Sequence, residues 1–160
     1  MKILVFADSH GDTGSVAQVM KRYYPDVAIH LGDGTDDLSV LGKGFPSTQF
    51  FYVTGNSNEP DNQGEPDRLI TLEGVSIFLT HMDRFRFKKD IDTVSKAMEL
   101  NAQIILCGDS HTPELFFSSG ITFMNPGSIS KEFGFRTFGI IAVIDGEYSC
   151  EVLFADLFLA

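Results

Sequence analysis

The sequence contains no tryptophan, has two cysteines and shows no apolar run of the roughly 18 residues that a membrane span needs. Cys107 and Cys150 stand in apolar, strand-like stretches, which indicates buried thiols in a reducing compartment and argues against a disulfide framework. The apolar stretch at the amino terminus is too short for a signal peptide and runs directly into Asp8 and His10. We therefore expect a cytoplasmic protein with no membrane partner.

Basic residues are also scarce. The chain has 12 lysines and arginines against 22 acidic residues, a formal net charge of -10. Binding to nucleic acid depends on clustered positive charge, because phosphate contacts dominate its affinity. The cluster formed by Arg84, Arg86, Lys88 and Lys89 is short, and it is more typical of a solvated segment before a helix. We therefore expect no nucleic-acid partner.

The apolar pattern of the 160 residues alternates between short β-rich runs and helical stretches. Strands are expected at 2–7, 26–31, 50–54, 68–72, 75–80, 103–108, 114–118, 121–125, 137–145 and 148–154, and helices at 13–23, 35–41 and 90–100. Continuous apolar runs are typical of strands buried on both faces. The order predicts an α/β fold in one domain of residues 1–160, with two mixed β-sheets packed as a sandwich and flanking helices.

Residues of metal-ligand type follow five of the expected buried strands. They are Asp8 and His10, Asp33, Asn56, His81 and Asp83, and Asp109 and His111. Ligands of open α/β sheets bind outside the carboxyl ends of the strands. Carboxylates together with imidazoles suit borderline metals such as manganese, iron and zinc. Two ions about 3.5–4 Å apart can hold both the attacking and the leaving oxygen of a phosphoryl group.

Each of these residues also has a simpler interpretation. Asp8 could cap a helix, Asp33 could stabilise a turn, and an asparagine after glycine, such as Asn56, is common in turns. The ordered occurrence at five strand ends favours the metal-ligand interpretation. His30 is different because it lies within a strand, so we expect a hydrogen-bonded core histidine and not a ligand.

The ordered motifs resemble those of the calcineurin-like metallophosphoesterase superfamily. They are Asp8-Ser9-His10, Gly32-Asp33, Gly55-Asn56, Thr80-His81 and Gly108-Asp109-Ser110-His111. The short chain and the Asn-Pro-Gly-Ser sequence at 125–128 are similar to its small prokaryotic phosphodiesterase branch. The resemblance covers nearly the whole chain. It implies the four-layer metallophosphoesterase fold, and a role for 125–128 as a loop that supports the site.

The resemblance also implies two divalent metal ions, with manganese expected first and iron, zinc, magnesium or nickel as alternatives. Asp8, His10 and His111 would hold the first ion, Asn56, His81 and Asp109 the second, and Asp33 would bridge them. A metal-bridging hydroxide would attack the phosphorus of a small phosphate ester in line with the leaving oxygen. Asn56 and Asp83 are the expected catalytic residues beside these ligands.

The chain departs from the family pattern at three places: at Asp109, at Met82-Asp83, where Met82 replaces a glycine, and at Asn58, where an aspartate is usual. Asp109 stands where a histidine is usual, which favours harder ions such as manganese or magnesium, and Asp83 also replaces a histidine. Asp83 could act as a general acid if its surroundings raise its pKa. We expect a phosphodiesterase or phosphatase. The alternative is an impaired site whose fold serves as a protein-binding module, as in the phosphoesterase-like subunit of retromer.

The sequence leaves the choice between monoester and diester substrates open, and also the oligomeric state. Several phenylalanines, among them Phe133 and Phe135, could belong to the core or to a surface patch that supports a homo-oligomer. A DNA nuclease of the same superfamily is disfavoured by the acidic composition.

Overall fold

Two five-stranded sheets form the centre of the computed structural model, which describes residues 1–35, 37–55, 64–82 and 91–159. The first sheet has the order β10 (Glu147–Phe154), β9 (Thr137–Ile144), β1 (Lys2–Phe6), β2 (Val27–His30) and β3 (Gln49–Tyr52). The second has the order β4 (Asp67–Leu72), β5 (Val75–Thr80), β6 (Ile104–Leu106), β8 (Ile121–Pro126) and β7 (Pro113–Ser118).

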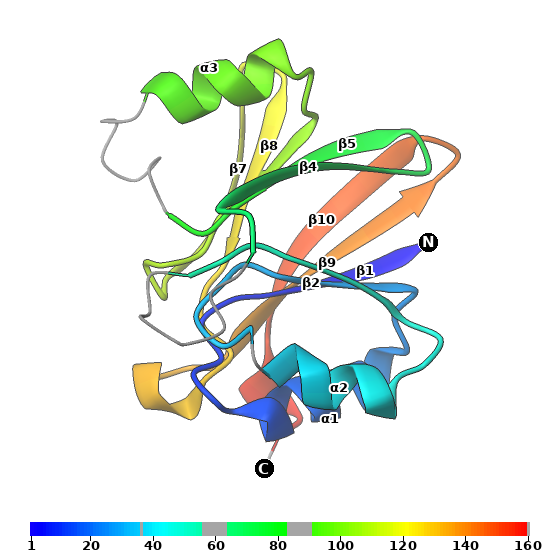
Figure 1. Ribbon diagram of the computed structural model, residues 1–160, viewed down its shortest axis with the longest axis vertical. Coiled ribbons are helices and arrows are strands. Elements are labelled where there is room, and N and C mark those ends of the chain that lie inside the picture. Colours follow the sequence, from blue (N-terminus) through cyan, green and yellow to red (C-terminus); the bar gives the residue numbers. More distant parts are fainter. Residues whose placement is uncertain (36, 56–63, 83–90, 160) are drawn as a thin grey trace.

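Both sheets are mixed. β1, β2 and β3 run parallel, as do β5, β6 and β8, whereas β9, β10, β4 and β7 pair in antiparallel fashion. The parallel strands β1 and β2 of the first sheet both end on the left in Figure 1. Neighbouring parallel strands have their carboxyl ends at the same edge of a sheet. The loops that follow these strands therefore lie close together.

The helices lie on the outer faces of the sandwich. α1 (Thr13–Tyr23) and α2 (Asp37–Gly44) cover the first sheet, and α3 (Ile91–Glu99) covers the second, as Figure 1 shows. Two short 3₁₀ helices, η1 (Lys131–Phe133) and η2 (Ala155–Leu157), complete the described secondary structure. The four layers confirm the predicted sandwich with flanking helices.

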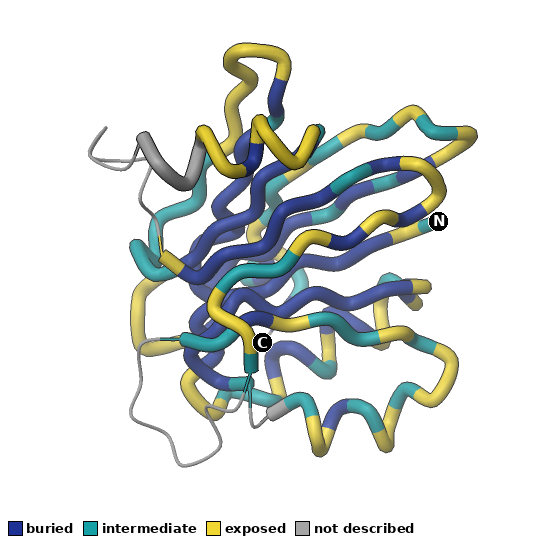
Figure 2. The backbone as a smooth tube through the Cα atoms, turned by 45° about the horizontal axis from the view of Figure 1, so that its top comes forward, coloured by how far each residue is buried: buried dark blue, intermediate teal, exposed yellow. Residues whose placement is uncertain are grey.

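Both faces of the central strands are buried. In β1, Ile3 and Val5 belong to the core between the two sheets, while Leu4 and Phe6 pack against Val19 and its neighbours on α1. Successive side chains of a strand point to opposite faces, so a continuous apolar run fills two cores at once. Figure 2 shows the buried residues concentrated in the strands and the exposed ones on helices and connecting loops.

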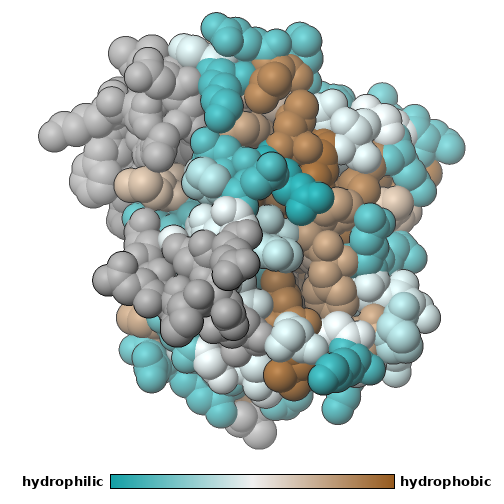
Figure 3. Space-filling model, in the orientation of Figure 1, coloured by the Kyte–Doolittle hydropathy of each residue, from teal (hydrophilic) through white to brown (hydrophobic). Residues whose placement is uncertain are grey.

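The remaining general features agree with the composition. Cys107 is buried and Cys150 half-buried, and both are free thiols. Within the described ranges, no helix combines the length and the apolar character that crossing a membrane requires. On the face shown in Figure 3, apolar side chains gather in a stripe down the middle, with hydrophilic side chains around it.

Candidate metal centre

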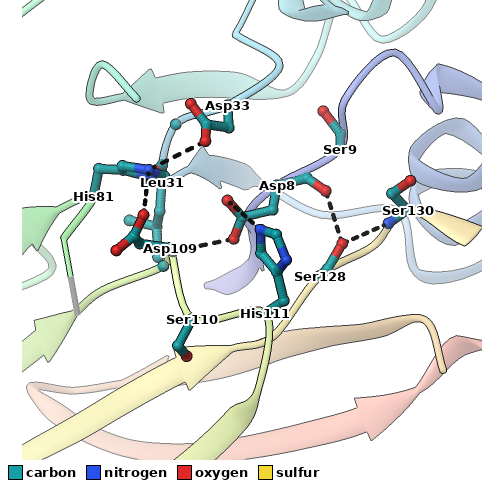
Figure 4. A network of polar contacts seen from close by, with 12 residues as sticks. Asp8, Ser9, Leu31, Asp33, His81, Asp109, Ser110, His111, Ser128 and Ser130 are labelled. Carbon is teal, nitrogen blue, oxygen red and sulfur yellow. Dashed lines mark hydrogen bonds and ion pairs between the residues drawn. The ribbon is translucent and has the colours of Figure 1, made fainter. Parts of the chain in front are cut away.

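Loops from both sheets bring six acidic and imidazole side chains together at one end of the sandwich. Figure 4 shows Asp8, Asp33, His81, Asp109 and His111 of this cluster. They are Asp8 and His10 after β1, Asp33 after β2, His81 after β5, and Asp109 and His111 after β6. Ligand atoms of Asp8, His10 and His111 lie within 4.8 Å of one another, and so do those of Asp8, Asp33 and His81. Asp8 is therefore common to two groups, each of which could hold a metal ion.

Asp8 is fully buried at the centre of this cluster. Its Oδ2 atom accepts a hydrogen bond of 3.2 Å from the backbone nitrogen of Asp109, and Oδ1 lies 3.5 Å from Nε2 of His111. Burial, followed by the nearby carboxylate of Asp33, raises the pKa of Asp8 to about 8. A buried carboxylate that resists ionisation on its own is stabilised in its charged form by a bound cation.

His81 is held in a defined tautomer. Its Nδ1 atom lies 2.6 Å from the carbonyl oxygen of Leu31, and because a carbonyl can only accept, Nδ1 must carry the proton. In the neutral imidazole the lone pair is therefore on Nε2, which lies 3.4 Å from Asp33 Oδ2 and 3.5 Å from Asp109 Oδ1. Histidine ligands of metals are commonly oriented in this way by a backbone carbonyl.

Two buried atoms of this cluster find no hydrogen-bond partner among the described residues, namely Oδ1 of Asp8 and Nε2 of His81. Unpaired buried polar atoms are costly, so such atoms call for an explanation. Both are acceptor atoms of the type that binds divalent metals, and both belong to the groups defined above. The residues present therefore fit a metal centre. Burial also lowers the pKa of His111, which favours the neutral imidazole, the form that ligates a metal.

The backbone of the cluster is strained. Asp8, His10, Asp33, Asp109 and His111 all adopt positive φ angles, between 44° and 68°. Residues other than glycine rarely adopt this conformation, although aspartate and histidine tolerate it better than most. Such strain collects at functional sites, where the surrounding structure enforces it. Here the strained residues are the ones whose side chains meet in the cluster.

The 125–128 segment supports the cluster, in agreement with the expectation from sequence. Ser128 Oγ donates a hydrogen bond of 2.8 Å to the carbonyl oxygen of Asp8. Asn125 Nδ2 donates to the carbonyl oxygen of Gly108 at 2.9 Å and to Ser110 Oγ at 3.0 Å. The end of β8 thus binds the loop after β6, and the loop after β8 binds the loop after β1.

Comparison with known proteins identifies the family. The family model of the calcineurin-like phosphoesterase superfamily domain matches residues 1–146. This chain belongs to the calcineurin-like phosphoesterase superfamily. It is 31% identical over 134 residues to a probable metallophosphoesterase of Mycoplasma pneumoniae, covering 80% of this chain and 79% of that protein.

Solved structures of two other proteins have the same fold. A predicted phosphoesterase of Streptococcus pneumoniae superposes with a TM-score of 0.78 and 28% identity, covering 97% of this chain and 90% of that one. A variant of Vps29 from Entamoeba histolytica superposes with a TM-score of 0.73, covering 96% of this chain and 99% of that one. At 18% identity, this second likeness concerns the fold alone.

His30 is a core residue, as expected from its position inside β2. It is fully buried, and its Nδ1 atom accepts a hydrogen bond of 3.2 Å from the backbone nitrogen of Gly32. Nε2 must then carry the proton, which it donates to Ser9 Oγ at 3.0 Å. Burial lowers the pKa of His30 to about 3, so the ring stays neutral. His30 links the loops that carry Asp8 and Asp33 without contributing a ligand.

Phe133 is a neighbour of the site that the sequence did not reveal as such. Its ring centroid lies 3.9 Å from that of His111 and 5.0 Å from that of His10. Nothing in the local pattern connects this phenylalanine, in a 3₁₀ turn after β8, with the two histidines. By contrast, Phe138 of β9 is fully buried in the core beneath α1.

Six of the residues expected as ligands therefore lie together in the structure. Asn56 and Asp83, the two expected catalytic residues, lie outside the described residues, and so does the basic cluster at 84–89.

Proposed function

We propose that this member of the superfamily hydrolyses small phosphate esters with two divalent metal ions held at the clustered strand ends. The observation that carries the proposal is the sharing of Asp8 between two ligand groups, each with a buried atom that lacks a described hydrogen-bond partner. Family membership supports a phosphoesterase activity in general. The pair of groups supports a binuclear site in particular.

The arrangement supports the grouping of ligands expected from sequence, with one difference: Asp8 belongs to both groups and not to the first alone. Asp8, His10 and His111 form one group for the first ion. His81, with Asp109 beside its Nε2 atom, belongs to the second. Asp33 is the proposed bridge, because it lies within ion-pair distance of His81 and its ligand atom lies within 4.8 Å of that of Asp8, which also belongs to the first group. Asn56 remains the further proposed ligand of the second ion.

Bound divalent ions would supply positive charge for the phosphate and activate a water molecule at neutral pH. This charge is needed because the chain itself carries a formal net charge of -10. Other residues of the chain orient the proposed metal ligands. The carbonyl group of Leu31 fixes the tautomer of His81, and Ser128 holds the loop that carries Asp8. With Asp109 in place of a histidine, manganese is the proposed resident metal.

We further propose that residues 1–160 form one domain, since β10, which follows the region matched by the family, pairs along the whole of β9. The alternative function is a protein-binding module built on an impaired site. The structural likeness to Vps29 supports a fold that is compatible with it. The strained and buried ligand cluster favours an enzymatic function over a protein-binding one. A protein-binding surface on another part of the fold would not require such a cluster.

The test is hydrolysis of bis-p-nitrophenyl phosphate and p-nitrophenyl phosphate by metal-stripped protein titrated with Mn²⁺. Asp33→Asn removes the proposed bridge. Asp145→Asn is a matched control, because Asp145 also has a positive φ but lies in an exposed β9–β10 turn. We expect Mn²⁺-dependent release that Asp33→Asn abolishes and Asp145→Asn leaves unchanged. The ratio of the two rates distinguishes diester from monoester substrates. Metal binding without turnover of either ester would favour the binding module.

A further inference from the structure

We propose that Phe133 forms one wall of the substrate site and selects phosphate esters that carry an aromatic or other planar group next to the phosphate. The proposal rests on the proposed function, since it takes His10 and His111 as ligands of the first ion. It assigns a substrate class to the same site.

The position of the Phe133 ring carries this inference. The ring covers both imidazoles, with centroid distances of 3.9 Å to His111 and 5.0 Å to His10, and it meets them at angles of 46° and 53°. At the same time Phe133 remains 41% exposed. The residue thus contacts both ligand histidines while part of its surface stays open to solvent. A phosphate held at the first ion would present its organic group close to this exposed surface.

The segment that carries Phe133 is tied to the metal-binding loop. Ser128 Oγ donates to the carbonyl oxygen of Asp8 and accepts a hydrogen bond of 3.0 Å from the backbone nitrogen of Ser130, as Figure 4 shows. Ser130 Oγ in turn accepts from the backbone nitrogen of Glu132 at 3.2 Å, which caps η1. The backbone that carries Phe133 is therefore tied to the loop of Asp8, which lowers the ordering that stacking on the ring requires.

Exposure of a phenylalanine alone would carry no such inference, since single exposed apolar residues are common. Phe135, two residues further on, is 76% exposed and packs edge-to-face on Phe154, with 6.1 Å between centroids. It makes no described contact with the ligand cluster. Phe135 therefore provides a matched control from the same segment.

A competing explanation is that Phe133 only orients the two imidazoles. The two roles differ in what they predict for ligands. Aromatic stacking on Phe133 would strengthen binding of an aromatic ligand over an aliphatic one by about 2- to 10-fold. A purely orienting role would affect every phosphate ligand equally, because it acts through the metal site.

The experiment measures the dissociation constants of phenylphosphonate and methylphosphonate by calorimetry with Mn²⁺-loaded protein. Neither ligand is hydrolysed, so the readout does not depend on turnover. We expect the wild type to prefer phenylphosphonate by about 2- to 10-fold. Phe133→Leu should remove this preference while methylphosphonate binds within about twofold of wild type. Phe135→Leu should keep the preference, and Phe133→Tyr, which retains an aromatic ring, should keep it as well.

Several results would overturn the proposal: no preference in the wild type, binding of neither phosphonate, or a preference that survives in Phe133→Leu. Equal weakening of both ligands, or loss of Mn²⁺ from Phe133→Leu, would assign the residue to packing alone. If Phe133→Leu does not fold, Phe133→Tyr decides: loss of the preference in that folded variant overturns the proposal, and its retention supports it. Failure of the proposed function shows separately, as the absence of ester hydrolysis by wild type.

Discussion

Gly55 lies so close to Asp33 that a β-carbon on Gly55 would overlap the carboxylate and the backbone nitrogen of Asp33. Because the obstructing atoms include backbone, the clash cannot be relieved by moving a flexible side chain. We expect Gly55→Ala to displace Asp33, to weaken Mn²⁺ binding by at least about tenfold and to destabilise the fold by about 1–3 kcal/mol. Calorimetric Mn²⁺ titration and urea unfolding measure the two effects.

Gly42 provides the control for this substitution. It lies in α2, and a β-carbon there would meet no atom within 4 Å. Alanine in an open helical position is stabilising by about 0.5–1 kcal/mol relative to glycine. Gly42→Ala should therefore raise the free energy of unfolding and leave Mn²⁺ affinity unchanged. Wild-type Mn²⁺ affinity in Gly55→Ala would contradict the proposed role of Asp33.

The variant His81→Asn tests the roles of the two imidazole nitrogen atoms separately. The asparagine amide nitrogen can replace Nδ1 and donate to the carbonyl oxygen of Leu31, but no atom replaces Nε2. We expect a folded protein that binds about one Mn²⁺ per chain where the wild type binds about two. Elemental analysis after desalting gives the stoichiometry. An unchanged value would exclude His81 as a ligand.

Asp109→His introduces the histidine that the resemblance to the superfamily leads us to expect at this position. Asp109 has a φ of 68°, a conformation that histidine tolerates, and it faces Nε2 of His81 at 3.5 Å. An additional imidazole should shift the preference of the second site from Mn²⁺ toward Zn²⁺, on the order of tenfold. Competition between the two metals measures the shift. Asp109→Asn, which removes the charge without adding an imidazole, should lower the affinity for both.

Asp8 should make the metal-free protein less stable as the pH rises. Its pKa is near 3.8 when exposed and about 8 in the folded protein, so between these values the folded state holds a proton that the unfolded state has lost. The stability that this proton provides is present below pH 4 and is lost as the pH rises toward 8. His30, with a folded pKa of about 3, acts in the opposite direction, but only below about pH 6.5.

Between pH 6.5 and 8 the effect of Asp8 is therefore not opposed by that of His30. We expect the free energy of unfolding, measured with urea in EDTA, to fall there by up to about 1.4 kcal/mol per pH unit. Asp8→Asn cannot ionise and should show a flatter profile. Saturating Mn²⁺ should abolish the decline in the wild type, because the cation compensates the buried charge. Parallel profiles of wild type and Asp8→Asn without metal would show that Asp8 is not the cause.

The order of strands and helices could be predicted because the signals are local. A continuous apolar run such as residues 2–7 specifies a strand buried on both faces, whatever its partners are. The ligand candidates could be found for a related reason: parallel strands bring their carboxyl ends to one edge, so Asp8 and Asp33 had to be neighbours once β1 and β2 pair. The roles of Asn56 and Asp83 and the oligomeric state stay predictions.

Only the tertiary structure decided how the cluster is organised. The proton position on His81 depends on Leu31, 50 residues away, and the support of Asp8 by Ser128 spans 120 residues. The placement of Phe133 over His10 and His111 likewise joins distant parts of the chain. No periodicity encodes such contacts, because they arise from how two sheets and their loops pack. The sequence by itself therefore determined the fold and the type of site, and packing determined its tautomers, its shared ligand and its aromatic wall.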